Sequence, residues 1–105
     1  MEELTAEGAL GASRLMGVGA QSGAVVVGLS GVRRTKGLAL VFLDVSVSDN
    51  TQREMADLQR KGTRVFRCAP LADLTRSIGR EDVSVVGVKA GPLAKGMAKV
   101  LPPRP

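Results

Sequence analysis

Histidine, tryptophan and tyrosine are absent from this chain of 105 residues, and cysteine occurs once. The absence of histidine removes the most common general base of active sites and the most common metal ligand. With Cys68 alone and scattered carboxylates, the sequence contains no spacing typical of metal ligands. We therefore expect no metal, no cofactor and no enzymatic activity.

The single cysteine also excludes an intramolecular disulfide, which favours a reducing compartment and a cytoplasmic location. Cys68 ends a strand-like run, residues 64–68, and is expected to be a buried structural thiol. The longest apolar run, residues 38–43, is too short to span a bilayer, and the acidic start Glu2-Glu3 is unlike a secretory signal. We expect no membrane association.

Aromatic residues are limited to Phe42 and Phe66. This scarcity argues against recognition of single-stranded nucleic acid by base stacking. What the sequence does have is an aliphatic apolar fraction, with hydrophobic residues making up 44% of the chain. Its length and composition are typical of one globular domain.

Positive charge is in excess, with 15 Lys and Arg against 10 Asp and Glu and a net charge of +5. The excess is uneven, because residues 1–32 contain three acids and one cation, whereas residues 83–105 contain four cations and no acid. A small basic domain suggests a polyanionic partner, and nucleic acid is the most common one. The alternative is a basic protein without such a partner, since net charge says nothing about the fold.

Helical and strand patterns alternate along the chain. Strands are predicted at residues 25–27, 38–43, 64–68 and 83–88, and the run 38–43 is expected to be buried on both faces. Helices are predicted over residues 4–18, 29–36, 49–61, 70–78 and 92–101. This alternation predicts an α/β protein: a three-layer α/β/α sandwich with a mixed sheet of about four strands.

Two patterns resemble catalytic or nucleotide sites only superficially. Asp44 and Asp49 lie near a strand end, but no base or nucleophile accompanies them, so we interpret Asp49 as a helix cap and Asp44 as a turn residue. The glycine-rich segment 17–23 closes a helix and precedes a strand, whereas a phosphate loop follows a strand and opens a helix. A nucleotide-binding enzyme is therefore a distant hypothesis.

The segment after the first predicted strand has the order that a phosphate site needs. Residues 28–31 read Gly-Leu-Ser-Gly and begin a helical turn, where small residues leave backbone N–H groups open to an anion. Arg33, Arg34 and Lys36 follow directly. The alternative is a solvated run of charges on a turn.

Four segments resemble the motifs of one family in order and spacing. Residues 17–28 read Gly-Val-Gly-Ala-Gln-Ser-Gly-Ala-Val-Val-Val-Gly, and residues 74–83 read Leu-Thr-Arg-Ser-Ile-Gly-Arg-Glu-Asp-Val; residues 43–53 and the Gly-Pro-Leu-Ala of residues 91–94 complete the set. The chain resembles the kink-turn RNA-binding ribosomal protein superfamily, above all its bacterial YlxQ-type members and the domain that follows YlxR in proteobacterial proteins. The likeness covers about residues 9–101, the core of a single domain spanning residues 1–105.

The resemblance implies binding of RNA kink-turns without catalysis. The family's RNA face lies at the start of the second helix and in the loops after the second strand and before the last strand. Matched by motif, the resemblance indicates Gly28, Leu29, Ser30, Arg33, Gly79, Arg80, Glu81, Asp82 and Val83. Typical members carry Asn-Glu where this chain has Leu29-Ser30, but phosphate contacts need only backbone donors and cations.

The leading hypothesis is a monomeric, non-enzymatic binder of structured RNA, ribosomal or ribosome-associated, within a ribonucleoprotein. Phosphate contacts are assigned to cations expected on one edge of the sandwich: Arg33, Arg34, Lys36 and Arg80. Gly28 and Ser30 would present donors at a helix start. The alternative is a protein-interaction module that kept the fold but lost kink-turn recognition, since a fold alone does not decide function.

Overall fold

The computed structural model of the protein describes residues 1–80 and 82–101. Within these residues, five strands form one mixed sheet in the order β1-β4-β3-β5-β2. The strands are β1 (Glu2–Glu3), β2 (Val25–Val27), β3 (Leu38–Asp44), β4 (Arg64–Cys68) and β5 (Val85–Lys89). The strands β1, β4 and β3 are parallel to one another, and β5 is antiparallel to both β3 and β2.

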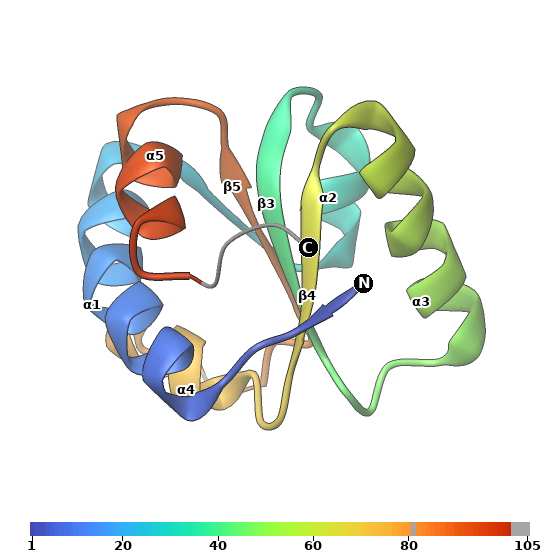
Figure 1. Cartoon of the computed structure of the whole chain (residues 1–105), viewed down its shortest axis with the longest axis horizontal. Helices are drawn as coiled ribbons and strands as arrows, with labels where there is room; N and C mark the ends of the chain where they lie inside the picture. Colours follow the sequence, from blue (N-terminus) through green and yellow to red (C-terminus); the bar gives the residue numbers. More distant parts are fainter. Residues whose placement is uncertain (81, 102–105) are drawn as a thin grey trace.

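Helices cover both faces of the sheet (Figure 1). One face carries α1 (Ala6–Ser22), α4 (Ala72–Thr75) and α5 (Pro92–Ala98), and the other carries α2 (Leu29–Arg34) and α3 (Asp49–Ala56). Short 3₁₀ turns continue two of the helices: η1 (Asp57–Lys61) after α3 and η2 (Arg76–Ile78) after α4. The protein is therefore the predicted three-layer α/β/α sandwich. None of the helices in the described part of the chain is long and apolar enough to cross a membrane.

The central strand β3 is buried on both faces, as its continuous apolar run predicts. Alternate side chains enter different cores. Leu40 and Phe42 belong to the core shared with α1 and α5, and Val41 and Leu43 belong to the core beneath α2 and α3. Phe42 stacks on Phe66 of β4, with ring centroids 5.3 Å apart. Both aromatic rings of the sequence are therefore enclosed in the core.

The number of strands differs from the predicted four because Glu2 and Glu3 form the edge strand β1. A run of two acidic residues does not predict a strand. Ion pairs with arginines of β4 hold Glu2 and Glu3 beside that strand. Arg64 forms an ion pair with Glu2 at 2.6 Å, and Arg67 forms one with Glu3 at 2.5 Å. This acidic strand covers the edge of β4, which would otherwise present open hydrogen-bonding groups.

Several boundaries also shift. The last strand begins at Val85 instead of residue 83, and α1 continues to Ser22, where Gly23 ends it in the left-handed conformation with φ 79°. The cap of α3 is Ser48, one residue before the predicted Asp49, and its Oγ accepts a hydrogen bond from the Thr51 N–H at 3.2 Å. The predicted helix 70–78 is only one α-helical turn followed by η2.

Cys68 is a buried structural thiol, as predicted. Its Sγ lies 3.3 Å from the carbonyl oxygen of Pro70, to which the thiol donates. Burial, and to a smaller extent the nearby carboxylates of Asp73 and Asp44, together raise the pKa of the thiol to about 11. The thiol therefore stays protonated at neutral pH.

Gly19 of α1 allows a close approach between helices. A Cβ at Gly19 would lie 2.0 Å from Cδ2 of Leu93 in α5 and 2.9 Å from Cγ2 of Val25. At Gly17, two residues earlier, a Cβ would meet only Ser77, with its nearest atom at 3.5 Å. The segment 17–23 is thus the last part of a helix that another helix approaches closely.

We predict opposite effects for alanine at these two glycines. Gly19→Ala should destabilise the protein by about 1–2 kcal/mol, because overpacking against Leu93 and Val25 outweighs the gain in helix propensity. Gly17→Ala should be neutral or stabilising by up to about 1 kcal/mol, because its methyl group fits. Urea denaturation of both variants measures the difference. Equal effects at both positions would contradict the packing role of Gly19.

Candidate nucleic-acid interface

The two segments of the predicted RNA face that are farthest apart in sequence meet in space. Gly28 and Leu29, at the start of α2, line the same surface hollow as Arg80, Asp82 and Val83, which precede β5. We call this the loop hollow; its volume is about 450 Å³. Its complete lining is Val27, Gly28, Leu29, Val47, Ser48, Thr51, Arg80, Asp82, Val83, Ser84 and Val85.

The backbone at Gly28 is open to this hollow. Gly28 has φ 92° and ψ 153°, a conformation that only glycine adopts readily, and a Cβ there would meet nothing within 4 Å. Its N–H donates to the carbonyl of Val85 at 2.8 Å, which attaches the start of α2 to β5. The next amides, of Leu29, Ser30 and Gly31, belong to the first helical turn, where helix geometry provides no acceptor.

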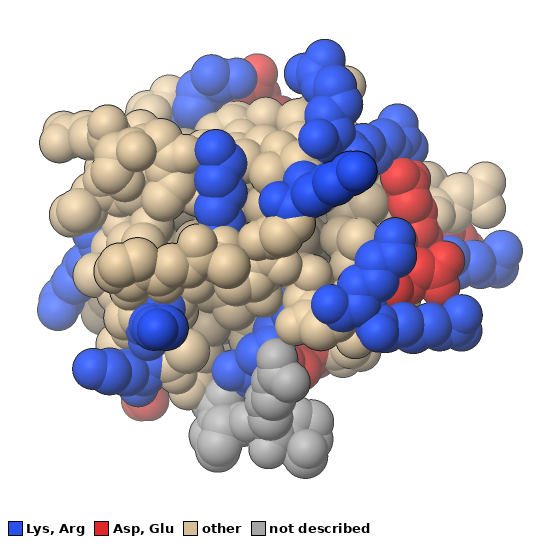
Figure 2. Space-filling model, turned by 90° about the horizontal axis from the view of Figure 1, so that it is seen from above, with Lys and Arg blue, Asp and Glu red and all other residues tan. Residues whose placement is uncertain are grey.

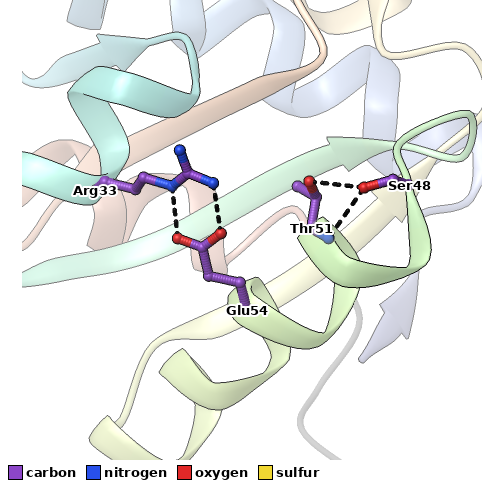
Figure 3. A network of polar contacts seen from close by, with 4 residues as sticks. All are labelled: Arg33, Ser48, Thr51 and Glu54. Carbon is purple, nitrogen blue, oxygen red and sulfur yellow. Dashed lines mark hydrogen bonds and ion pairs between the residues drawn. The ribbon is translucent and has the colours of Figure 1, made fainter.

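Three hydroxyl-bearing residues that line the loop hollow are not among the predicted site residues: Ser48, Thr51 and Ser84. Ser48 caps α3, and its Oγ lies 3.0 Å from Oγ1 of Thr51 (Figure 3). Both residues line the hollow, so the first turns of α2 and α3 open on to the same space. The family motif around residues 43–53 indicated this loop as part of the RNA face, but residue types alone did not indicate which side chains point into it.

The remaining residues before β5 differ in their exposure. Arg80 and Asp82 are exposed, and Val83 is half-buried against the core below α1. Gly79 ends η2 in the left-handed conformation with φ 72° and does not line the loop hollow. Glu81, also predicted for this face, lies outside the described residues. The guanidinium of Arg80 is thus the cation that this loop brings to the hollow.

Arg33 lies away from the loop hollow and is paired. Its Nε and Nη2 donate to Oε2 and Oε1 of Glu54 at 2.6 and 2.7 Å, and this two-fold contact joins α2 to α3 (Figure 3). The hydrogen bonds from Arg33 lower the pKa of the Glu54 carboxyl, and they raise the pKa of Arg33. Both side chains remain 39–51% exposed, so solvent screens the pair. The main effect of the ion pair is to hold the Nε and Nη2 side of the Arg33 guanidinium against α3.

The other predicted cations lie toward the far end of α2. Lys36 lines a second hollow, between α2 and α3, together with Arg33, Thr63 and Lys61. This helix hollow has a volume of about 780 Å³ and shares no residue with the loop hollow. Arg34 and Ser30 are exposed and line neither hollow. The expected single surface is therefore divided: Arg80 lies with Gly28 at one edge of the sheet, and Lys36 lies at the other.

Asp44 and Asp49, considered from the sequence as a pair of acids, have roles in the fold. Asp44 Oδ1 accepts the N–H of Leu71 at 2.8 Å, and Oδ2 accepts the N–H of Ser46 at 3.0 Å and its hydroxyl. Asp44 is the last residue of β3 and not, as predicted, a turn residue, and its carboxylate joins the end of this strand to the following turn and to Leu71 before α4. Asp49 lies in the first turn of α3. In residues 1–80 and 82–101, no cluster of three metal-ligating side chains occurs.

Comparison with known proteins identifies the fold. No family model matches the sequence, and no match was found among curated proteins. The structure is similar to the solved structure of a protein with unknown function from Bacillus halodurans C, with a TM-score of 0.71 and 21% sequence identity. The similarity covers 87% of this chain and 96% of that chain. At this identity, the likeness shows that the α/β/α fold is shared.

We predict that Asp44→Ala destabilises the protein by about 1–3 kcal/mol, because the N–H of Leu71 loses its acceptor. The hydrogen bonds from Leu71, and then from Ser46, lower the pKa of Asp44 from its usual value of 3.8. A depressed pKa stabilises the fold at pH values above 3.8, and the effect is lost as the pH falls through the lower folded-state pKa.

The deficit of Asp44→Ala should therefore be full at pH 7 and should shrink below about pH 4. Urea titrations of the variant and the unchanged protein at several pH values measure it. Asp49→Ala is the matched control, with an expected cost below about 1 kcal/mol from the helix dipole. A deficit of Asp44→Ala that is independent of pH would contradict this assignment.

Proposed function

We propose that the protein binds structured RNA at the loop hollow and acts without catalysis. The observation that carries the proposal is that Gly28 and Leu29 share one hollow with Arg80, Asp82 and Val83. About fifty residues of sequence separate the two segments, and the family resemblance assigns both to one RNA face. A ribosomal RNA, or an RNA associated with the ribosome, is the proposed partner.

The chemistry of the loop hollow suits a sharply bent phosphate backbone. Backbone amides at the start of α2 and the Thr51 hydroxyl, which accepts from Ser48, supply neutral donors, and Arg80 supplies a positive charge. A kink brings phosphates of both strands close together, so closely spaced donors and a cation match it. Both aromatic rings are buried in the core, so base stacking on aromatic side chains contributes nothing.

A protein-interaction module is the alternative function, and the lining of the same hollow favours it. Leu29 and Val47 supply apolar surface, and the carboxylate of Asp82 repels phosphate. Leu29 and Ser30 also provide no amide or carboxylate to read the edges of purine bases. A partner protein could place an apolar side chain in this hollow and leave Arg80 at the rim.

Arg80→Glu tests the RNA proposal. We expect kink-turn RNA to bind the unchanged protein with an affinity that falls steeply between 50 and 200 mM salt, roughly in proportion to the phosphates contacted. Arg80→Glu should weaken binding by about tenfold and reduce the slope of log affinity against log salt by about 1. Filter binding or gel shift over a salt series measures both.

Arg14→Glu is the matched control, because Arg14 is an exposed cation on α1 and changes the net charge equally. Equal losses for the two variants would show that charge alone governs binding. If the unchanged protein binds neither kink-turn nor duplex RNA at 50 mM salt, where counterion release strongly favours binding, the RNA proposal is wrong. A partner protein that binds the unchanged protein but not Arg80→Glu would then support the interaction module.

A further inference from the structure

Lysines gather at the edge of the sheet opposite the loop hollow. At this edge β3 and β4 begin and β5 ends. Four exposed lysines come from four different elements or their connections, and we call them the lysine edge: Lys36, Lys61, Lys89 and Lys95. Figure 2 looks down on this edge and shows the blue side chains of Lys and Arg spread across it.

Backbone contacts bring the four segments together. Leu38 pairs with Lys89, and the N–H of Ala90 donates to the carbonyl of Gly37 at 3.0 Å. Thr63, two residues after Lys61, donates its hydroxyl to the carbonyl of Leu38 at 2.7 Å. Lys95 lines a shallow hollow of about 320 Å³ with Gly62 and Gly91. The lysines therefore surround one continuous area.

The charges of the lysine edge are not neutralised within the described part of the chain. None of the four lysines forms an ion pair with a residue among 1–80 and 82–101. Two acids, Glu54 and Asp57, line the helix hollow together with Lys36 and Lys61, and they pair with Arg33 and Arg60. Most of the red atoms in Figure 2 accordingly lie together at one flank. The remaining surface is positive.

Small residues predominate in the area between the lysines. The shallow hollow beside Lys95 is lined by Ala39, Gly62, Ala90, Gly91, Ala94 and Ala98, together with the ion-paired Arg64 and the buried Leu40. A Cβ at Gly37 or Gly91 would meet nothing within 4 Å, so the backbone there faces open space. A large, stiff polyanion can lie on such a surface while flexible lysines reach its phosphates.

Among the described residues, no strongly exposed large hydrophobic side chain lies between these lysines, and the apolar walls of the adjoining helix hollow, Val32, Leu38, Met55 and Leu58, are mostly buried. The large hydrophobic residues that are most exposed in the described chain lie elsewhere: Met1, Leu10, Val18, Val45 and Val100. Protein interfaces usually centre on buried apolar or aromatic anchors, whereas duplex backbones are bound mainly by cations. The absence of such anchors near these lysines favours nucleic acid over an acidic protein.

We propose that the lysine edge is a second RNA-binding surface, which contacts the phosphate backbone of an RNA duplex. The choice of RNA as the ligand rests on the proposed function, but the surface is separate from the loop hollow. The seven residues of β3 lie between the two, a length of roughly 20 Å. A duplex at each edge would make the protein a bridge between two RNA segments.

Removal of three charges tests this surface. The edge variant combines Lys61→Gln, Lys89→Gln and Lys95→Gln, which leaves Arg80 and Lys36 unchanged. The control variant combines Arg14→Gln, Arg53→Gln and Lys99→Gln, three exposed cations without an ion pair to any described residue. Both variants have the same net charge, and equal thermal unfolding midpoints confirm that both are folded.

The first measurement is the affinity for a short, straight RNA duplex over a salt series. The edge variant should lower the slope of log affinity against log salt by roughly 2–3, at slightly less than one unit per lost phosphate contact. The control variant should leave the slope nearly unchanged. Equal slopes for the two variants would overturn the proposal. Labelled poly-glutamate that binds the unchanged protein as tightly as the duplex would overturn the assignment to RNA.

The second measurement is bridging. Kink-turn RNA is immobilised, the protein is bound to it, and capture of a labelled straight duplex is measured. We expect the edge variant to bind the immobilised RNA but to capture no duplex, and we expect Arg80→Glu to bind the immobilised RNA about tenfold more weakly while binding free duplex as the unchanged protein does. Failure of kink-turn binding alone would count against the loop hollow and leave the duplex measurement to decide the lysine edge.

Discussion

The burial of β3 on both faces determines the position of every other element. Its alternating side chains belong to two separate cores, so helices must cover both sides of the sheet. Its hydrogen bonds run to β4 on one side and to β5 on the other, and the two neighbours have opposite directions. One end of β3 therefore meets the loop before β5, and the other end meets the loop after it. The loop hollow and the lysine edge are the two ends of this strand.

Helix α2 connects these two ends. It begins at the open backbone of Gly28, which is bound to β5, and it ends near Lys36, which lines the helix hollow. The two-fold contact between Arg33 and Glu54 spans the space between α2 and α3. Arg33 is close in sequence to the predicted RNA site at Gly28, but its side chain joins two helices instead. Gly28 and Lys36 are close in sequence but do not share a surface, because α2 and the two residues after it together carry the chain from one edge toward the other.

The sequence predicts the layers, the central strand and the buried thiol correctly, because each depends on apolar periodicity or on a single residue. It does not predict β1, since Glu2 and Glu3 have no strand pattern and are held by arginines about sixty residues away. The role of Gly19 is equally hidden, because its neighbour Leu93 comes from the last helix. The family motifs identify the loops of the hollow, but they do not reveal that Ser48 points into it or that Lys36 lies at the opposite edge.

Net charge alone therefore says little about where a polyanion would bind. The acidic N-terminal strand pairs with Arg64 and Arg67 along β4, and Glu54 pairs with Arg33. These pairs remove positive charge from the flank formed by β4 and α3. Among the cations without ion pairs to described residues, Arg80 lies at the loop hollow and four lysines form the lysine edge, whereas Arg14, Arg34, Arg53 and Lys99 belong to neither group. In the proposed function, these two groups contact two parts of a folded RNA, and the length of β3 sets the distance between the two contacts.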